Sequence, residues 1–368
     1  MTDPLSPAAP CGSPSRRRVL GLLASLPLSR GLGGVPFAPA AVELKPVPGA
    51  ARPRPPAARD ATLLVGGPPD GATGRWAGLV APALTQGLPP GSHIALRPLG
   101  GLDGVTAANR FAAAPAPDGS RLLFAPVATV QAWLAGETRA RFDVGTWLPV
   151  LAGAAPAVLM GRFPLARLRG QTVRVAVERL PGSDMAALLG LHLLGAHPVP
   201  VPGLSRPGRA AALLAGHIDA ALLTGPGVAA LVARLTGSGL VPLAGFGAAG
   251  ALRRDPAFPT LPHLGELCPP ALTGGALFAA WRASALSAQL VFSTTLPTLT
   301  PAAMVALWRD AASTAATSPV LAEALRGDEV SALAGPAAMG AQRVLAAPVP
   351  ALLALRQWLS AHRDWRVG

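Results

Sequence analysis

The sequence contains no tyrosine, a single lysine (Lys45) and only two cysteines, and aromatic residues make up 4% of the chain. Charged residues are also scarce, at 13%, and the formal net charge of +13 comes almost entirely from arginine. These arginines are scattered, and no basic helix with interleaved aromatic residues occurs, so the composition argues against nucleic-acid binding. A basic balance still favours small anionic ligands in general.

Long uninterrupted hydrophobic runs are missing as well. The longest uncharged segment, Ala283 to Trp308, contains Pro297 and Pro301, which excludes a helix that spans a bilayer. Hydrophobic residues nevertheless make up 51% of the 368 residues, enough for a substantial buried core, and this excludes disorder as the main state. The length predicts two lobes.

Motifs of the common enzyme classes are absent: no G-x-S-x-G, Walker loop, H-E-x-x-H or C-x-x-C occurs. His192 and His197 are five residues apart, which misses the spacing that aims two imidazoles of one helix at a metal. Cys11 lies in the N-terminal segment, and Cys268 has no histidine partner, so we expect a partly buried, unreactive thiol and no internal disulfide. The sequence therefore predicts a protein that is not an enzyme, with no cofactor and no metal.

The N-terminus carries the pattern of an export signal. Arginines 16–18 precede an apolar stretch at residues 19–28, and Ala38-Pro39-Ala40 is a small-residue cleavage site, so residues 1–41 are predicted to be a signal peptide. The paired arginines resemble the twin-arginine pattern, with an ordinary Sec signal as the alternative. Residues 42–60 are proline-rich and predict an extended linker.

From residue 61 onward, strand and helix patterns alternate. The predicted strands are Thr62–Gly66, His93–Arg97, Arg121–Pro126, Thr172–Val177 and Ile218–Leu223. The predicted helices are Arg75–Gln86, a segment from Gly104 to about Ala114, Met185–Leu194 and Arg209–Ala215. Two more helices are predicted near the C-terminus, one capped by Thr300 with Pro301 at its first position and one capped by Ser318 with Pro319 at its first position. This order is typical of parallel sheets with crossover helices, here in two α/β lobes.

Three turns in this pattern each join the end of a strand to the start of a helix, at residues 68–74, 100–104 and 181–184. Such places present unpaired backbone N–H groups and the positive end of a helix dipole. Ligands of open α/β sheets bind at these carboxyl ends of strands. For Asp70, Asp103 and Asp184, hydrogen bonding to the local backbone as turn or cap residues is the favoured interpretation. The turns indicate a binding protein.

Six short motifs occur in an order that points to one family. They are Val65 to Gly74, Arg97-Pro98-Leu99-Gly100-Gly101, Ala116 to Leu123 with Pro117-Asp118-Gly119, Phe142-Asp143 followed by Leu148-Pro149-Val150, Leu214 to Ala220 with Gly216 and Asp219, and Phe258 to Pro262. In this order the chain, from about residue 61 to 365, resembles the tripartite tricarboxylate transporter receptors, the Bug family of periplasmic solute-binding proteins. Gly74 stands where the family has aspartate, and Ser120 where it has an aromatic residue.

The resemblance implies a type II periplasmic binding-protein fold, with two α/β lobes and a ligand cleft between them. Lobe 1 is expected over residues 61–156 and 283–368, and lobe 2 over residues 157–282. The residues that the resemblance assigns to the cleft are Pro69, Asp70, Gly71, Thr73, Gly100, Gly101, Thr106, Gly182, Ser183, Asp184, Thr224 and Gly225. It further implies a monomer in the periplasm that captures a small carboxylate for membrane permease subunits.

Two other functions stay open at this stage. One is a ligand-sensing subunit whose closed lobes engage a membrane kinase instead of a permease. The other is an exported enzyme, which twin-arginine export would suit but which the missing metal and nucleotide motifs disfavour.

Overall fold

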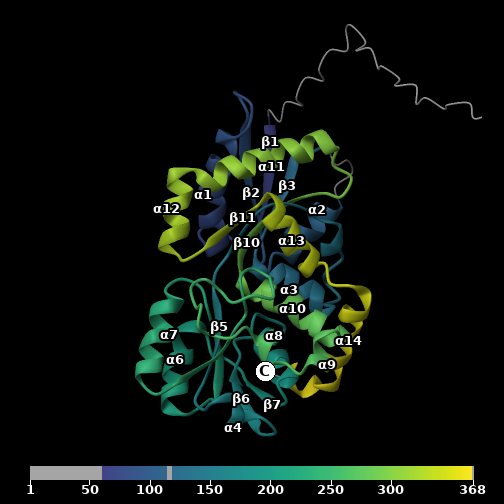
Figure 1. Ribbon diagram of the computed structural model, residues 1–368. Coiled ribbons are helices and arrows are strands. Elements are labelled where there is room, and N and C mark those ends of the chain that lie inside the picture. The colour runs from purple at the N-terminus through teal and green to yellow at the C-terminus, as the bar shows by residue number, and fades with distance from the viewer. Residues whose placement is uncertain (1–59, 114–117, 367–368) are drawn as a thin grey trace, which may run out of the picture. The chain divides into compact units, whose positions relative to one another are not determined.

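The computed structural model describes residues 60–113 and 118–366. In this part of the chain, helices and strands alternate, and the strands form two separate sheets (Figure 1). The predicted signal peptide and all but the last residue of the predicted linker lie outside the described residues.

The first sheet has six strands. They are β1 (Asp60–Gly66), β2 (His93–Leu99), β3 (Arg121–Ala125), β4 (Leu148–Ala154), β10 (Leu290–Leu296) and β11 (Ser331–Ala334). Their order is β11-β4-β10-β3-β1-β2, with β1 parallel to both of its neighbours and β10 antiparallel to β3 and β4. Because β1 lies between two strands and under helices, Leu63, Leu64 and Val65 are all buried rather than alternating.

The second sheet has five strands. They are β5 (Ala157–Gly161), β6 (Thr172–Ala176), β7 (His197–Val201), β8 (Ala220–Thr224) and β9 (Val241–Gly245). Their order is β7-β6-β8-β5-β9, with β6 parallel to β7 and β8, and β5 antiparallel to β8 and β9. Residues 155 and 156 connect β4 of the first sheet directly to β5 of the second.

The helices associated with the first sheet are α1 (Ala72–Gln86), α2 (Val105–Ala112), α3 (Val127–Ala135), the 3₁₀ turn η1 (Val144–Thr146), α11 (Ala302–Thr317), α12 (Pro319–Gly327) and α13 (Gly335–Leu345). Helix α1 packs on α11. Trp76 of α1 lies 5.3 Å from Phe292 of β10, which in turn stacks on Phe124 of β3 at 5.2 Å between ring centroids. These rings tie the helix layer to the middle of the sheet.

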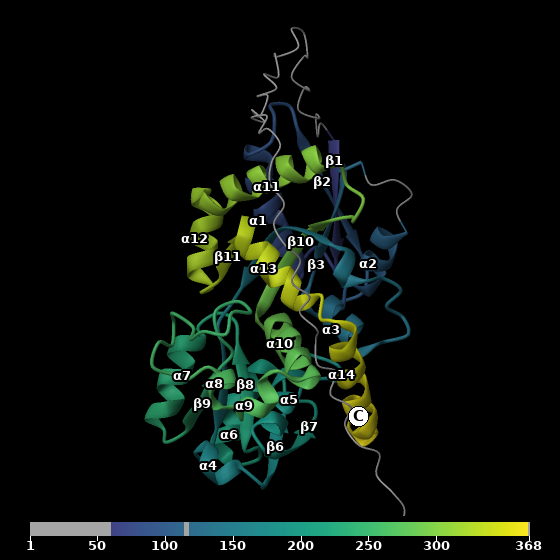
Figure 2. The ribbon, with the colours of Figure 1, turned by 45° about the vertical axis from the view of Figure 1, so that its right-hand side comes forward.

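The remaining helices are α4 (Leu165–Leu168), α5 (Met185–Leu193), α6 (Arg206–Ala215), α7 (Val228–Gly237), α8 (Leu264–Leu267), α9 (Pro270–Thr273), α10 (Ala276–Gln289), α14 (Val349–Ala361) and the 3₁₀ turn η2 (Arg363–Arg366). Helix α5 is apolar and buried almost all round, and the indole of Trp281 in α10 donates to its Ala186 carbonyl at 3.2 Å. Helix α14, the yellow helix near the C-terminus in Figure 2, packs on α10 and α3.

The predicted fold class is confirmed: the described residues form two sheets with crossover helices. The lobe boundaries stay a prediction. The strands of the first sheet fall within residues 60–154 and 290–334 and those of the second within 157–245, while α10 runs across the expected boundary at residue 282.

Of the two predicted helix caps, one differs in the structure and the other lies at the predicted residue. Helix α11 begins at Ala302 with Pro301 in the N-cap position, and the Thr300 hydroxyl donates instead to the Pro297 carbonyl at 2.8 Å. The fixed φ of proline suits the N-cap position here as well as the first helical position. Ser318 is the N-cap of α12, as predicted, but its side chain makes no capping hydrogen bond.

Two further sequence expectations concern a membrane helix and the lone thiol. Within the described ranges, no single helix is long and apolar enough to cross a bilayer, and only the pair α13 and α14, bent by 52°, reaches that length and composition together. Cys268 is buried, and burial raises the pKa of its thiol to about 11, which agrees with the predicted unreactive cysteine.

Candidate ligand-binding site

The three parallel strands of the first sheet, β1, β2 and β3, have their carboxyl ends on the same side of that sheet. A Cβ atom on Gly66, at the end of β1, would lie 2.8 Å from both Gly104 Cα and Pro126 Cδ, which immediately precede α2 and α3. Only glycine permits this approach of the backbones. The starts of α2 and α3 and the end of β1 therefore lie together.

In the second sheet, the parallel strands β6 and β8 end beside the first turns of α5 and α6. Gly182 allows the tight turn that joins β6 to α5, because a Cβ atom there would collide with the Arg179 carbonyl oxygen. Ser205 is the N-cap of α6, with Arg206 and Pro207 following in its first turn. Thr224 is the last residue of β8.

These two groups of loops enclose a cavity of about 440 Å³, called here the ligand cleft. Its lining combines the first turn of α3, the turn before α5, the first turns of α6 and the end of β8. The lining residues are Leu102, Val127, Ala128, Gln131, Glu178, Arg179, Gly182, Ser183, Asp184, Arg206, Arg209 and Thr224. The cleft therefore lies at the carboxyl ends of strands from both sheets.

A hydrogen bond joins α3 to the turn before α5, two of the segments that line the cleft. The amide nitrogen Nε2 of Gln131, in α3, donates to the Ser183 hydroxyl at 3.2 Å, and Gln131 is buried.

The ionisation of Asp103, before α2, is affected by the positive charge of Arg179, a residue that lines the cleft. Burial raises the pKa of Asp103, but the Val105 amide, the Arg139 guanidinium at 2.8 Å and the charge of Arg179 outweigh it, so that the pKa is lowered.

The most buried charges of the cleft pair with each other. Asp184 Oδ2 accepts from Arg209 Nη2 at 2.8 Å and from the Glu178 amide at 2.9 Å. The other donors of Arg209 bind the Leu222 carbonyl at 2.8 Å and the Leu204 carbonyl at 3.2 Å. Its guanidinium is thus occupied by the protein, which makes Arg209 a support for the turn and not a free ligand cation.

Asp184 is unusual for a turn residue because only 1% of it is exposed. Burial raises the pKa of its carboxyl, against the attraction of Arg209 and the hydrogen bond from Glu178. Its second oxygen, Oδ1, is buried and has no hydrogen-bond partner among the described residues. Asp184 is therefore held by tertiary contacts and carries an unsatisfied acceptor at the cleft wall.

Two other arginines line the cleft without a carboxylate partner. Neither Arg179 nor Arg206 forms an ion pair within the described part of the chain. Desolvation of the Arg206 guanidinium and repulsion by Arg209 lower the pKa of Arg206, although a guanidinium stays a cation at neutral pH. These two groups supply positive charge that a bound anion can neutralise.

Backbone donors add to this positive field. In the described structure, the amides of Gly182, Ser183 and Asp184 donate to no protein acceptor, whereas the amides from Met185 onward bond within the helix or its turn. The cleft also receives the N-termini of α3, α5 and α6. Three helix N-termini with two free guanidinium groups form a site suited to a small anion.

Four of the twelve residues predicted for the cleft line it: Gly182, Ser183, Asp184 and Thr224. The other eight do not line this cavity. Pro69, Asp70, Gly71 and Thr73 lie between β1 and the first turn of α1, and Gly100, Gly101 and Thr106 lie around the turn between β2 and α2. Gly225 follows Thr224, and a Cβ atom on it would lie 2.5 Å from Arg206 Nη1.

The role predicted for Asp184 needs correction. The sequence favoured a turn or cap residue that hydrogen-bonds the local backbone. In the structure Asp184 is itself the N-cap residue, and its side chain makes no capping bond. Its Oδ2 accepts from the Glu178 amide of the same turn and also from Arg209, an ion pair with a distant residue that the sequence did not indicate.

Sequence reasoning missed the arginines of α6. The predicted helix began at Arg209, whereas α6 begins at Arg206. A signal for the earlier start was present: Ser205 is a favoured N-cap residue, and Pro207 is a favoured first-turn residue. No signal in the sequence pairs Arg209 with Asp184. Among the described residues, no group of three or more His, Cys, Asp or Glu side chains is placed to hold a metal.

No protein-family model and no curated protein matches the chain. Among solved structures, the chain is similar to a TctC solute-binding protein from Polaromonas at 18% identity and a TM-score of 0.62, covering 82% of this chain and 98% of that one. This likeness shows the two-lobe fold of a solute-binding protein. It therefore agrees with the predicted type II periplasmic binding-protein fold.

Two further structures resemble the chain more distantly. One is MatC from Rhodopseudomonas palustris with bound malate, at 22% identity and a TM-score of 0.46, covering 83% of this chain and 98% of that one. The other is the periplasmic binding protein BugD, at 16% identity and a TM-score of 0.47, covering 84% and 98%. At TM-scores below 0.5, these two likenesses do not bear on the ligand of this chain.

Proposed function

We propose that this protein is a solute-binding protein that captures a small carboxylate in the ligand cleft and delivers it, as a monomer in the periplasm, to a tripartite tricarboxylate-type transporter. The observation that carries the proposal is the meeting of three helix N-termini with two arginines that have no carboxylate partner. The fold of a solute-binding protein supports a binding role, and the sequence resemblance supports the carboxylate and the transporter.

The groups of the cleft divide into those that bind and those that hold the binding groups in place. Arg206, Arg179 and the free amides of the turn before α5 face the anion and neutralise it. The Asp184–Arg209 pair fixes that turn against α6. Preorganised donors of this kind bind a charged ligand without the cost of ordering flexible side chains.

A thermal-shift panel of mono-, di- and tricarboxylates tests the proposal, with neutral sugars as the contrasting set. A carboxylate that binds only the folded state raises the melting temperature. Arg206→Gln removes one charge-assisted hydrogen bond, worth about 1.5–3 kcal/mol, so the affinity should fall about tenfold to a hundredfold. Arg326→Gln, on the exposed end of α12, removes the same charge away from the cleft and should leave the affinity unchanged. Stabilisation by sugars without a response to any carboxylate would contradict the proposal.

Export is a separate part of the proposal, because residues 1–41 lie outside the described part of the chain. A twin-arginine signal requires both arginines of its pair. Replacing Arg16 and Arg17 by lysine should keep the protein in the cytoplasm, as measured by fractionation of expressing cells. Unchanged export would favour the Sec alternative instead.

A further inference from the structure

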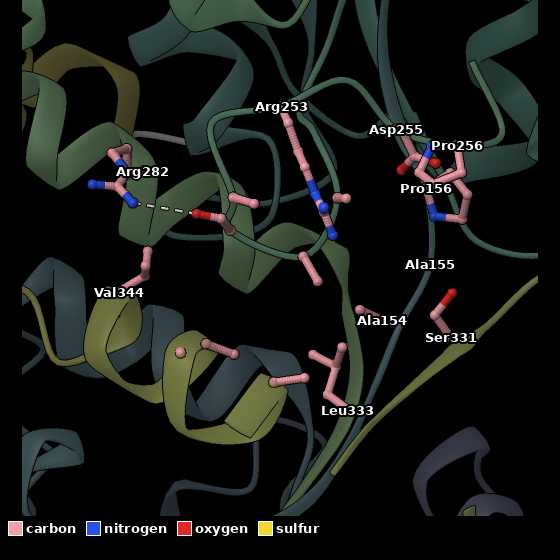
Figure 3. Close-up of a pocket in the computed structure, with 17 residues that line it drawn as sticks. Ala154, Ala155, Pro156, Arg253, Asp255, Pro256, Arg282, Ser331, Leu333 and Val344 are labelled. Atoms are coloured by element: carbon pink, nitrogen blue, oxygen red, sulfur yellow. Dashed lines mark hydrogen bonds between the residues drawn. The ribbon is translucent and has the colours of Figure 1, made fainter. Parts of the chain in front are cut away.

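A second cavity, of about 470 Å³, lies around the segment that joins the two sheets (Figure 3). It shares no lining residue with the ligand cleft. Its walls come from residues 154–156 between β4 and β5, residues 248–256 after β9, α10, β11 and α13. We call it the junction cavity. Nothing in the proposed function uses it.

Three charged side chains line the junction cavity: Arg253, Arg282 and Asp255. In the view of Figure 3, Arg253 lies between the other two, and the dashed line marks the bond from Arg282 Nη2 to the Gly250 carbonyl at 3.3 Å. Arg253 forms no ion pair within the described residues. Asp255 is buried, and its Oδ1 accepts from the Ala257 amide at 2.9 Å. The lining thus carries two guanidinium groups and one carboxylate.

Arg282 has a donor that the protein leaves unsatisfied. Its Nε is buried and has no hydrogen-bond partner among the described residues. An unsatisfied buried donor costs about 1–3 kcal/mol, and more when the group is charged. Because Nε is buried, an anion in the cavity reaches the guanidinium at Nη1, which has no hydrogen-bond partner among the described residues, and the negative charge offsets part of that cost.

The rest of the lining is apolar or small. Alanine, glycine and proline dominate, with Leu333 and Val344 completing the walls. Such walls favour a ligand with an apolar body, because burying apolar surface contributes roughly 25 cal/mol per Å². Asp255 opposes a second negative charge, since two carboxylates in a partly buried site repel each other.

We propose that the junction cavity is a second ligand site, which takes a small monocarboxylate with an apolar or aromatic body. The carboxylate binds Arg282 Nη1 and the Arg253 guanidinium, and the body packs against Ala155, Pro156 and Leu333. Asp255 excludes di- and tricarboxylates. The charge of the lining, two cations and one anion, matches the single charge of this ligand.

Benzoate is the probe that tests this proposal, measured by equilibrium dialysis with the full-length chain. The background variant is Arg206→Gln, which weakens any binding in the ligand cleft. Within it, Gly340→Leu fills the junction cavity: a Cβ atom on Gly340, in α13, meets nothing within 4 Å, so the side chain can extend into the space. Benzoate affinity should fall at least about tenfold. Gly78→Leu, at an equally open position in α1, is the matched control and should leave it unchanged.

Arg282→Met provides a second variant in case Gly340→Leu does not fold. It keeps most of the length of the side chain, removes the guanidinium together with its unsatisfied Nε, and should lower benzoate affinity at least about tenfold without lowering the melting temperature. Benzoate that binds both variants as tightly as the Arg206→Gln parent would overturn the proposal. So would the absence of millimolar binding to that parent, or benzoate binding that Arg206→Gln alone abolishes. These readouts do not depend on which carboxylate occupies the ligand cleft.

Discussion

Replacing Asp184 by alanine separates the structural account of the ligand cleft from the interpretation that the sequence alone favoured. A turn aspartate that bonds only to its own backbone can be replaced at small cost. In the structure, however, Asp184 is 1% exposed and Arg209 is 3% exposed, and their side chains are 2.8 Å apart. Asp184→Ala therefore leaves a buried guanidinium without its counter-charge.

Removing one partner of a buried ion pair costs about 3–5 kcal/mol. For a chain of this size, such a loss lowers the melting temperature by about 5–8 °C. Urea unfolding followed by far-ultraviolet circular dichroism measures the free energy of unfolding, and a thermal melt gives the temperature shift. The Glu178 amide also loses its acceptor, so the turn before α5 should loosen and carboxylate affinity should fall as well.

The double variant Asp184→Ala with Arg209→Met is the control that isolates the buried charge. Methionine fills most of the space of the arginine and carries no charge, and replacing both partners of a buried pair is often close to neutral. The double variant should therefore recover part of the stability that Asp184→Ala loses, and not all of it, because the Leu204 and Leu222 carbonyls lose their Arg209 donors. A loss below about 1 kcal/mol in the single variant, or simply additive losses in the double one, would refute this reasoning.

Three other outcomes follow from single contacts. Gly225→Ala should weaken carboxylate binding at least about tenfold, because its Cβ would lie 2.5 Å from Arg206 Nη1 at a φ of +92°; titration calorimetry that shows unchanged affinity would count against Arg206 as a ligand group. Burial lowers the pKa of His263 from 6.5, so the unfolded chain takes up a proton at a higher pH than the folded chain does, and the stability of the folded protein falls as the pH drops below 6.5. The urea midpoint should fall less with pH in His263→Asn than in the parent, and an equal fall in both would exclude His263 as the source. In a Cys11→Ser background, native Cys268 should react with iodoacetamide about 100-fold more slowly than in the unfolded chain, because its pKa is about 11; equal rates would show that the thiol is not buried.

The sequence predicted the part of the fold that local signals determine. β1, β2, β3 and β6 were located because each is a short apolar run followed by a glycine or proline turn. β7 and β9 were missed because proline interrupts both of them, at Pro198, Pro200 and Pro242. Both are edge strands, where proline is tolerated because one side needs no ladder hydrogen bonds.

Long-range pairing was beyond local reasoning. β10 inserts between β3 and β4 although it follows both of them far along the chain, and nothing in its own residues specifies that place. The same holds in the ligand cleft. Its turn at Gly182 to Asp184 has a recognisable composition, whereas the partner of Asp184 lies 25 residues further on, in a helix whose start was misplaced.

Charge is the property of the ligand cleft that the sequence leaves most open and the structure resolves best. The net charge of +13 says nothing about which arginines meet a ligand. The opposite charges of Asp184 and Arg209 cancel. Among the other lining residues, Arg179 and Arg206 carry two positive charges and Glu178 carries one negative charge, so the net charge of the lining is +1. Three helix N-termini, each equivalent to about half a positive charge, raise the total to roughly +2.5.

A field of this size favours a dianion over a monoanion, which gives a last prediction about ligand selectivity. Succinate and butyrate have the same carbon chain and differ by one carboxylate, so their affinities compare charge at nearly constant size. Succinate should bind the ligand cleft at least about tenfold more tightly than butyrate, and added salt should narrow the difference by screening the exposed part of the field. Titration calorimetry at low and physiological ionic strength measures both effects. If butyrate binds as tightly as succinate, the helix N-termini do not act on the ligand, and the charge argument for the ligand cleft is wrong.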